Sequence, residues 1–203
     1  IESFIEENDI NKKYQVEYYQ DIEKKIAELL ANYKIVARFK GRTEFGARSL
    51  GNRAILGNPK DMQTFYLVND MIKVRDFWMP FAPSVIDKDA KNIMKVIKNH
   101  YNQYMTISFD VKKKFIDKIP AAVHPFDKTC RPQFVNKKLN LKYYNLIKEF
   151  KKITNLGLLL NTSFNLHGEP IVFEPKNAIK SFLNSGLEYL YIGDYLVTKT
   201  NKK

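Results

Sequence analysis

The feature that most constrains the fold is the alternation of short apolar runs with longer segments of helical period. The runs IVARF (35–39), NRAIL (52–56), FAPSVI (81–86), GLLLN (157–161) and YLYIGDYLV (189–197) are typical of strands. GLLLN is continuously apolar, as in a strand that is covered on both faces. Helical segments are predicted from Asp21, from Pro59 and Asp61 to about Lys73–Asp76, from Tyr143 to Ile153 and from Pro175 to Leu183. Such alternation predicts a single α/β domain.

The remaining segments carry weaker signals. AAVH (121–124) and PQFV (132–135) are predicted to pair as strands, and residues 88–120 form a lysine-rich middle of short elements. Residues 1–17 are predicted to be a linker or extension, with the domain over 18–200 and its first element near Asp21. The sequence does not begin with methionine, which suggests a piece of a longer protein.

Composition limits the class of protein. The one cysteine, Cys130, cannot form an intrachain disulfide, so a reducing compartment such as the cytoplasm is expected. No apolar run reaches the roughly 18 residues of a membrane span. The net charge of +12 would suit a nucleic-acid-binding protein, but the lysines are spread along the chain without a stripe at helical spacing. Nucleic acid is therefore not the expected partner.

Arginine is concentrated in one segment. Only six of the 34 basic residues are arginine, and four of them lie between Arg38 and Arg53, in a stretch that is also rich in glycine. Arginine grips phosphate or carboxylate through two parallel hydrogen bonds that lysine cannot copy, and glycine lets the backbone approach a ligand. This segment follows a predicted strand, so the pattern predicts an anion site. The alternative is a solvated loop with surface ion pairs.

Other loops could complete that site. In an open α/β sheet, ligands collect outside the carboxyl ends of strands. The segment Thr162–Pro170, with Ser163 and Asn165, follows one predicted strand, while Lys73–Arg75 lies at a helix end and Arg131 follows Thr129. Each signal alone is weak, because such short patterns occur by chance in most chains.

Together and in this order the motifs resemble a known family. The segments GRTEFGARSLGNRAIL, IKVRDFWMPFAPSV, H-x-x-DKTCRPQFV, LLLNTSFNLHGEPIV and YIGDYLV are similar to the carboxy-terminal domain of the NodU/CmcH carbamoyltransferases. The resemblance covers about Tyr18 to Val197. The chain departs from the family pattern at Ala47 in place of proline, Ser49 in place of alanine and Lys128 in place of glycine, and Lys128 changes the turn chemistry near Arg131.

The resemblance implies a fold and a site. It implies a YrdC-like fold, a twisted mixed sheet with flanking helices. The K-x-R and S-x-N positions that embrace the nucleotide in such domains fall on Lys73, Arg75, Ser163 and Asn165. Arg48, Arg53 and Arg131 are then assigned to carbamoyl phosphate.

The resemblance also implies a reaction. A domain of this family takes carbamoyl phosphate and ATP, forms carbamoyladenylate and releases pyrophosphate. The carbamoyl group then passes to an acceptor on an amino-terminal ASKHA-type domain that binds a metal. Mg²⁺ is expected to accompany the ATP, and no residue of this chain is assigned to a metal of its own. The implied chemistry is electrostatic, because fixed guanidinium and ammonium groups stabilise the charge that develops on phosphate oxygens.

Two other functions remain open. A threonylcarbamoyl-adenylate synthase would share the K-x-R and S-x-N pairs but use threonine and bicarbonate, and a basic domain could recognise RNA through shape and phosphates. Several residues near the predicted site have structural interpretations. Arg38 and Arg42 are expected in ion pairs at the loop base, Glu44 is expected to orient the arginines, and Cys130 is expected to be inert. Other residues with structural interpretations are His124 and His167 as hydrogen-bonded side chains, Phe77, Trp78 and Phe81 as core, and Asp194 as a turn residue.

Overall fold

An eight-stranded mixed sheet forms the centre of the protein, in the order β1-β10-β9-β2-β3-β8-β4-β7. The computed structural model describes residues 1–73, 80–97 and 100–199, except for the side chains of Met71 and Lys73. The strands are β1 (Gln15–Tyr18), β2 (Val36–Phe39), β3 (Arg53–Gly57), β4 (Ala82–Ile86), β7 (Gln133–Val135), β8 (Leu158–Ser163), β9 (Tyr189–Ile192) and β10 (Tyr195–Thr198). The pairs β2–β9 and β4–β7 are parallel, and the other pairs are antiparallel. β5 (Phe109–Asp110) and β6 (Thr129–Cys130) form a separate pair.

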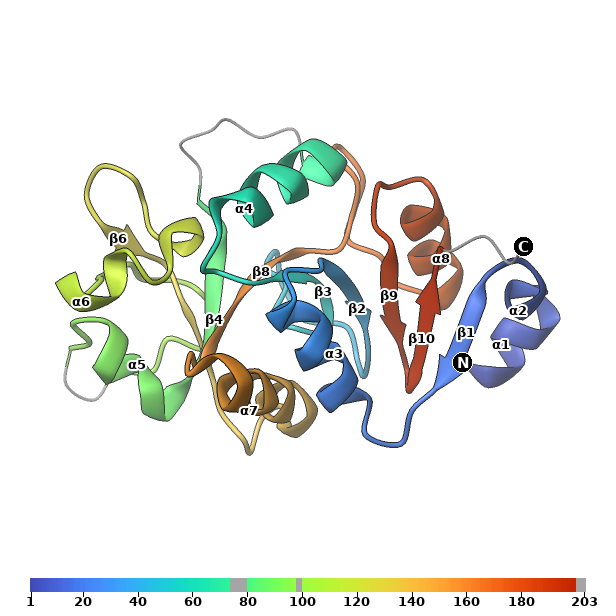
Figure 1. Ribbon diagram of the computed structural model, residues 1–203, viewed down its shortest axis with the longest axis horizontal. Helices are drawn as coiled ribbons and strands as arrows, with labels where there is room; N and C mark the ends of the chain where they lie inside the picture. The colour runs from blue at the N-terminus through green and yellow to red at the C-terminus, as the bar shows by residue number, and fades with distance from the viewer. Residues whose placement is uncertain (74–79, 98–99, 200–203) are drawn as a thin grey trace.

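Helices flank the central sheet. They are α1 (Glu2–Glu7), α2 (Ile10–Lys13), α3 (Ile22–Ala31), α4 (Met62–Val68), α5 (Asp87–Ile93), α6 (Lys113–Ile116), α7 (Leu141–Thr154) and α8 (Pro175–Leu183), with a π-helix η1 (Asn69–Lys73) and a 3-10 helix η2 (Pro120–Ala122). In Figure 1, α3 and α7 lie side by side below the central strands, and α4 lies above them. The prediction of a mixed α/β domain is confirmed.

Local sequence explains where the helices start. The Asp61 carboxylate accepts a hydrogen bond from the Gln63 backbone N–H (2.8 Å) at the start of α4. The Asn140 side chain accepts one from the Tyr143 N–H (3.1 Å) at the start of α7. At α8, Glu174 and Asn177 cap each other's backbone N–H groups. Each cap satisfies a donor that the helix itself leaves unpaired.

The core lies between the sheet and its helices. Leu158, Leu159 and Leu160 of β8 are all buried, which confirms that this strand is covered on both faces. α3 contributes Ile22, Ile26 and Leu30 at helical spacing, and α7 packs against it through residues such as Phe150. Burying large apolar side chains of this kind is the main source of folding free energy, at about 1.5–3 kcal/mol for each.

The amino-terminal segment differs from the prediction. Residues 1–17, expected as an extension without regular elements, form α1, α2 and most of β1. β1 pairs antiparallel with β10, from Gln15 opposite Thr198 to Tyr18 opposite Tyr195. The prediction of a first element near Asp21 is therefore wrong. α1 and α2 are short and bury one apolar residue each, Ile5 and Ile10, so they have no apolar stripe that the sequence could reveal. The domain boundary at residue 18 stays a prediction.

Two further expectations are corrected. AAVH is not a strand, since Pro120 starts the η2 helix there, and PQFV pairs with β4 instead. The helix predicted from Pro59 and Asp61 is α4 followed by η1. Phe81 is buried in the core as expected, and Phe77 and Trp78 lie outside the described residues.

The glycines of the β2–β3 loop provide a test of this packing. Gly46 and Gly51 have nearly equal φ angles of +107° and +108°, but an added Cβ would meet open space at Gly46 and the Tyr143 ring at Gly51. Gly46→Ala should cost about 1 kcal/mol of unfolding free energy from backbone strain. Gly51→Ala should cost at least about 3 kcal/mol because the clash is added. Urea unfolding of both variants measures the difference, and equal losses would show that α7 does not press on the loop.

Candidate functional site

A cavity of about 550 Å³ opens where the β2–β3 loop meets the segment between β6 and β7. Arg48 of the loop and Arg131, which directly follows β6, both line it. Phe81 and Ala82 at the start of β4 form part of its wall, with Thr129 and Cys130 of β6. The structure thus brings together two arginines that are 83 positions apart in the chain.

The two guanidinium groups repel each other across this cavity. Burial, and then the charge of Arg48, lower the pKa of Arg131, although an arginine remains charged at neutral pH. Among the described residues, neither arginine forms an ion pair with a carboxylate. An anion between them would relieve the repulsion and accept hydrogen bonds from both forks. The cavity is therefore suited to a small phosphate-class or carboxylate ligand.

A buried polar network fixes both arginines. The Asn161 side-chain nitrogen of β8 lies within hydrogen-bond distance of the Ser49 carbonyl (3.1 Å), the Ser84 hydroxyl (2.9 Å) and the Gln133 side-chain oxygen (3.3 Å). Gln133 donates in turn to the Leu50 carbonyl (2.8 Å), and Ser84 donates to Gln133 (2.7 Å). Ser49 follows Arg48 directly, and Gln133 lies two positions after Arg131, so one network sets the backbone of both.

The base of the β2–β3 loop is held by a carboxylate. Glu44 Oε1 accepts from the backbone N–H groups of Leu50 (2.8 Å), Asn52 (2.6 Å) and Arg53 (3.1 Å). Burial lowers the pKa of the Arg53 guanidinium, and the nearby charge of Glu44 opposes this shift. The expectation that Glu44 orients the arginines stays a prediction, since its hydrogen bonds go to the backbone. It shapes the loop by satisfying amides that would otherwise lack partners.

Arg38 and Arg53 lie below this loop. Arg38 is fully buried, donates to the Gly51 carbonyl, and lies 5.2 Å from each of the ring centroids of Tyr143 and Tyr191. Arg53 donates to the Gly41 carbonyl (3.1 Å) and stacks on Phe39 at 3.6 Å. Within the described part of the chain, Arg38 and Arg42 form no ion pair, so the expectation of ion pairs at the loop base is wrong. Arg38 forms hydrogen bonds and ring contacts instead.

Arg53 does not line the cavity of Arg48 and Arg131 in the part of the chain that the structure describes. Its guanidinium is directed to backbone carbonyls at the loop base. Of the three arginines assigned to carbamoyl phosphate, Arg48 and Arg131 thus line one cavity, and Arg53 is bound to the base of the β2–β3 loop. Its contact with that ligand stays a prediction.

The S-x-N segment follows β8 directly. The Ser163 hydroxyl lies 2.6 Å from the Asn165 side-chain oxygen, and Asn165 donates to the Glu169 carbonyl (2.8 Å). The His167 N–H donates to the Ile72 carbonyl (3.0 Å), which brings this segment beside the carboxyl end of η1. Lys73 is the last residue of η1, but its side chain and the whole of Arg75 lie outside the described residues. The backbone at Ile72, directly before Lys73, therefore lies next to the segment that follows β8.

The turn between η2 and β6 carries a histidine and an aspartate. His124 Nδ1 lies 3.1 Å from Asp127 Oδ1, and the Asp127 pKa is lowered, chiefly by the hydrogen bond from the Thr129 backbone N–H. His124 lines the arginine cavity. Cys130 also lines it, and burial raises the Cys130 pKa to about 12, so the thiol stays protonated and unreactive at neutral pH.

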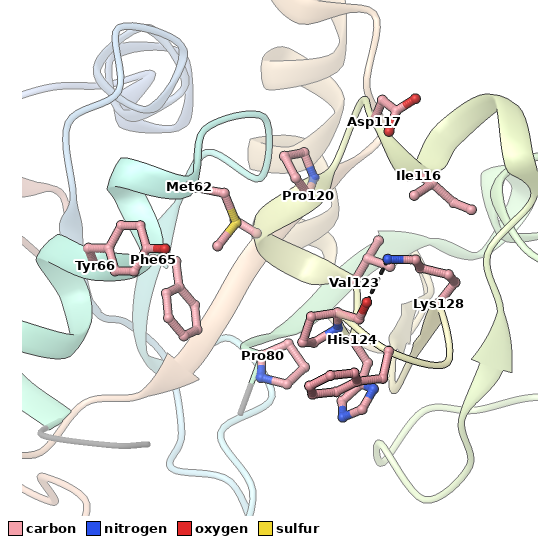
Figure 2. A pocket seen from close by; sticks show the side chains of 13 residues that line it. Met62, Phe65, Tyr66, Pro80, Ile116, Asp117, Pro120, Val123, His124 and Lys128 are labelled. Atoms are coloured by element: carbon pink, nitrogen blue, oxygen red, sulfur yellow. Dashed lines mark hydrogen bonds between the residues drawn. The ribbon is translucent and has the colours of Figure 1, made fainter. Parts of the chain in front are cut away.

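A second, apolar pocket of about 340 Å³ adjoins the arginine cavity. Figure 2 shows Met62 and Phe65 on one side of it and Val123 and His124 on the other, with Pro80 drawn between Phe65 and His124. Pro80 and His124 line both spaces.

Sequence reasoning missed several residues that build the site. Asn161 was read only as the end of an apolar strand, and Asn102 gave no signal at all. Asn102 is buried and donates to the Pro132 carbonyl (2.9 Å), which anchors the segment beside Arg131. A buried asparagine has no distinctive local pattern, so only its burial in three dimensions identifies it.

The described residues contain no group of three or more His, Cys, Asp or Glu side chains arranged to hold a metal ion. Over the same residues, every helix is too short or too polar to cross a membrane.

The fold and the motifs define the class of protein. The structure of Escherichia coli YciO has a TM-score of 0.60 at 14% identity, covering 86% of this chain and 79% of that one. The HypF structure of T. kodakarensis also has a TM-score of 0.60, at 19% identity, covering 93% of this chain and 23% of that one. At such low identity these similarities show the fold alone, which is the YrdC-like fold that the resemblance implied.

Sequence comparison adds the family. The family described as "Carbamoyltransferase C-terminus" matches residues 27–199, and the chain belongs to it. An uncharacterised protein of Methanocaldococcus jannaschii is 43% identical over 85% of this chain and 28% of its own length. The nodulation protein NolO of Bradyrhizobium diazoefficiens is 37% identical over 88% of this chain and 33% of its own. The chain thus spans about a third or less of these relatives.

The buried network yields a prediction. Asn161→Ala removes the shared partner of three acceptors and should lower the unfolding free energy by about 2–4 kcal/mol. Ser49→Ala is the matched control, since it removes only the 3.3 Å hydrogen bond from the hydroxyl and keeps the carbonyl contact. It should cost under about 1 kcal/mol. Chemical denaturation measures both, and a loss at Asn161 no larger than at Ser49 would contradict the role of the network.

Lys128 yields a second prediction. Its φ of +59° lies in the left-handed region, where the family pattern has glycine. Lys128→Gly should raise the unfolding free energy by about 1 kcal/mol, because glycine adopts this conformation without a steric penalty. Lys128→Ala is the control, since it removes the same side chain, including the hydrogen bond to the Pro125 carbonyl, and keeps the penalty. Thermal melting of both should separate them, and no gain for the glycine variant would contradict the strain.

Proposed function

We propose that this domain activates a carbamoyl group, forming carbamoyladenylate from carbamoyl phosphate and ATP. The observation that carries the proposal is the pairing of Arg48 and Arg131 across one cavity without a carboxylate between them in the described structure. Membership of the carbamoyltransferase family supports a transferase. A HypF structure of the same fold, with a TM-score of 0.55 and 16% identity, is titled as the phosphate- and nucleotide-bound form.

The proposed reaction has two steps. Water first splits carbamoyl phosphate into carbamate and inorganic phosphate. A carbamate oxygen then forms a bond to the α-phosphorus of ATP, the bond from that phosphorus to the β-phosphate oxygen breaks, and pyrophosphate leaves. Charge accumulates on non-bridging phosphate oxygens in both steps, so preorganised cations stabilise the transition states.

The residues divide between the two ligands. Arg48, Arg131 and Arg53 are proposed for carbamoyl phosphate. Arg48 and Arg131 line the cavity, and Arg53 also donates to the Gly41 carbonyl at the loop base. Lys73, Arg75, Ser163 and Asn165 are proposed for the phosphates of ATP. Mg²⁺ would be bound mainly by those phosphates.

The proposal extends to the rest of a longer protein. The relatives are about three times as long as the matched region or more, and an amino-terminal ASKHA-type domain is the proposed site where the carbamoyl group meets its acceptor. The single, buried Cys130 suits a protein of the reducing cytoplasm.

The test is to incubate the chain with ATP, Mg²⁺ and carbamoyl phosphate and to measure pyrophosphate, with bicarbonate and threonine as the comparison. We expect pyrophosphate only with carbamoyl phosphate. Product only with threonine and bicarbonate would favour the threonylcarbamoyl-adenylate synthase. Titration with each ligand accompanies the assay, and failure to bind either, with salt-sensitive RNA binding retained, would favour a basic RNA-binding module.

Conservative variants test the arginine pair. Arg48→Lys and Arg131→Lys keep the charge but lose the two-pronged hydrogen bond, so carbamoyl phosphate should bind about tenfold to a hundredfold more weakly. Arg42→Lys is the matched control, because Arg42 is exposed in the same loop and does not line the described cavity. Calorimetry measures all three, and equal affinities would remove the arginine pair from the site.

A further inference from the structure

We propose that an exposed apolar patch near β7, the last strand of the sheet, is a docking surface for an acidic segment of a partner protein. Its members come from the segment between α5 and β5 and from the connection of β7 to α7, and they are between 48% and 75% exposed. This docking patch consists of Ile97, Tyr101, Tyr104, Leu139 and Leu141. The proposed carbamoyl activation uses none of these residues, so the inference goes beyond the proposed function.

Two hollows in the surface meet at Phe134 of β7. Tyr101 lines a hollow of about 270 Å³, and Tyr104 and Leu139 line a second one of about 220 Å³. Phe134 lines both hollows, so they adjoin each other. The exposed side chains therefore surround concave ground into which side chains of a partner can insert, as anchors do in protein interfaces.

The two aliphatic ends of the docking patch border the same hollows. His100 lines the first hollow, and its backbone N–H donates to the Ile97 carbonyl (3.2 Å). Asn140 lines the second hollow and directly precedes Leu141. All members of the docking patch thus lie at one or the other hollow.

The turn that carries both tyrosines is firmly attached to the sheet. Asn102, between them, is fully buried, and its side chain donates to the carbonyls of Ile107 (2.8 Å) and Pro132 (2.9 Å). The same side chain accepts from the Thr106 backbone N–H (3.1 Å), and the Phe134 N–H donates to the Asn102 carbonyl (2.8 Å). A surface that is already ordered loses less conformational entropy when it binds a partner.

Positive charge surrounds the docking patch. Two exposed lysines line the first hollow and two directly precede Leu139, and they are Lys88, Lys91, Lys137 and Lys138. Within the described part of the chain, none of the four forms an ion pair with a carboxylate. Asp87 in the first hollow accepts from the Asn136 side chain (2.7 Å), and Glu44 in the second holds the loop amides. Unneutralised lysines around an apolar centre complement a partner with acidic residues around apolar ones.

The composition of the docking patch favours a protein partner over the alternatives. Three of its five members are aliphatic, and aliphatic side chains do not stack on nucleic-acid bases as aromatic rings do. Aromatic and aliphatic side chains within a polar rim are instead typical of protein interfaces. A second copy of this chain is disfavoured, because a two-fold dimer would bring the same lysines of both copies together.

The experiment is a selection from a random peptide library displayed on phage, carried out against the intact chain. We expect the enriched peptides to combine Asp or Glu with spaced apolar residues. The tightest of them is labelled with a fluorophore, and its affinity is measured by anisotropy at low and high salt. Binding should weaken as the salt concentration rises, because ions screen the attraction of the lysines.

Variants of the docking patch locate the binding. Tyr101→Ala and Tyr104→Ala should each weaken the selected peptide about tenfold, as expected for aromatic anchors. Combined Lys137→Glu and Lys138→Glu should weaken it and reduce its dependence on salt. Phe173→Ala is the matched control, because Phe173 is 64% exposed, close to the 62% of Tyr104, and is not among the described residues that line either hollow. Thermal melting establishes that each variant is folded.

Several outcomes would overturn the proposal. They are failure to enrich any peptide, enrichment of peptides without acidic residues, and an affinity that Tyr101→Ala and Tyr104→Ala leave unchanged. Binding of a uridine oligonucleotide, or of vesicles of equal parts phosphatidylcholine and phosphatidylserine, that both variants abolish would assign the docking patch to another class of partner. Sedimentation of a wild-type dimer that both variants dissociate would assign it to a second copy. Pyrophosphate release by the wild type tests carbamoyl activation separately from all of these.

Discussion

The hydrogen-bond network around Asn161 is the interaction on which the site depends. It joins β8, β4 and β7 to the end of the β2–β3 loop through one buried side chain. Inside a protein, a hydrogen bond is stronger than in water, but an unpaired polar group is correspondingly costly. The loop end and the strands therefore have one arrangement in which Asn161, Ser84 and Gln133 are all satisfied. That arrangement directs two distant arginines into one cavity, even though like charges repel.

Much of the fold could be predicted from the sequence. The strands at 35–39, 81–86 and 157–161 were recognisable as short, mainly apolar runs, and α3 because its apolar residues recur at helical spacing. The pairing partners could not be predicted. AAVH has strand-like composition, yet the fixed φ of Pro120 starts a 3-10 helix there. The amino-terminal helices were missed since only one apolar residue of each is buried.

Part of the candidate site could also be predicted from the sequence. Arginine in a lysine-rich chain identified Arg48 and Arg131, whose side chains share the cavity. The same signal selected Arg53 and Arg38, which hold the loop from below through carbonyl oxygens and aromatic rings. Residue type alone cannot separate these roles, because a guanidinium can donate hydrogen bonds to a backbone carbonyl as well as to a phosphate. The difference lies in burial. Arg53 is almost fully buried, whereas Arg48 remains exposed at the loop end.

The pairing of β1 with β10 has a consequence for the two ends of the chain. β10 would be the outermost strand of the sheet if β1 were lost, and its backbone N–H and C=O groups facing outward would have no partners. Such an uncovered ladder readily accepts a strand from another molecule, which leads to aggregation. By pairing with β10, Gln15–Tyr18 therefore covers the backbone groups through which two copies of the domain could associate. Any shortened version of the domain that begins after Tyr18 would have β10 as an exposed edge strand, even if its arginine cavity remained intact.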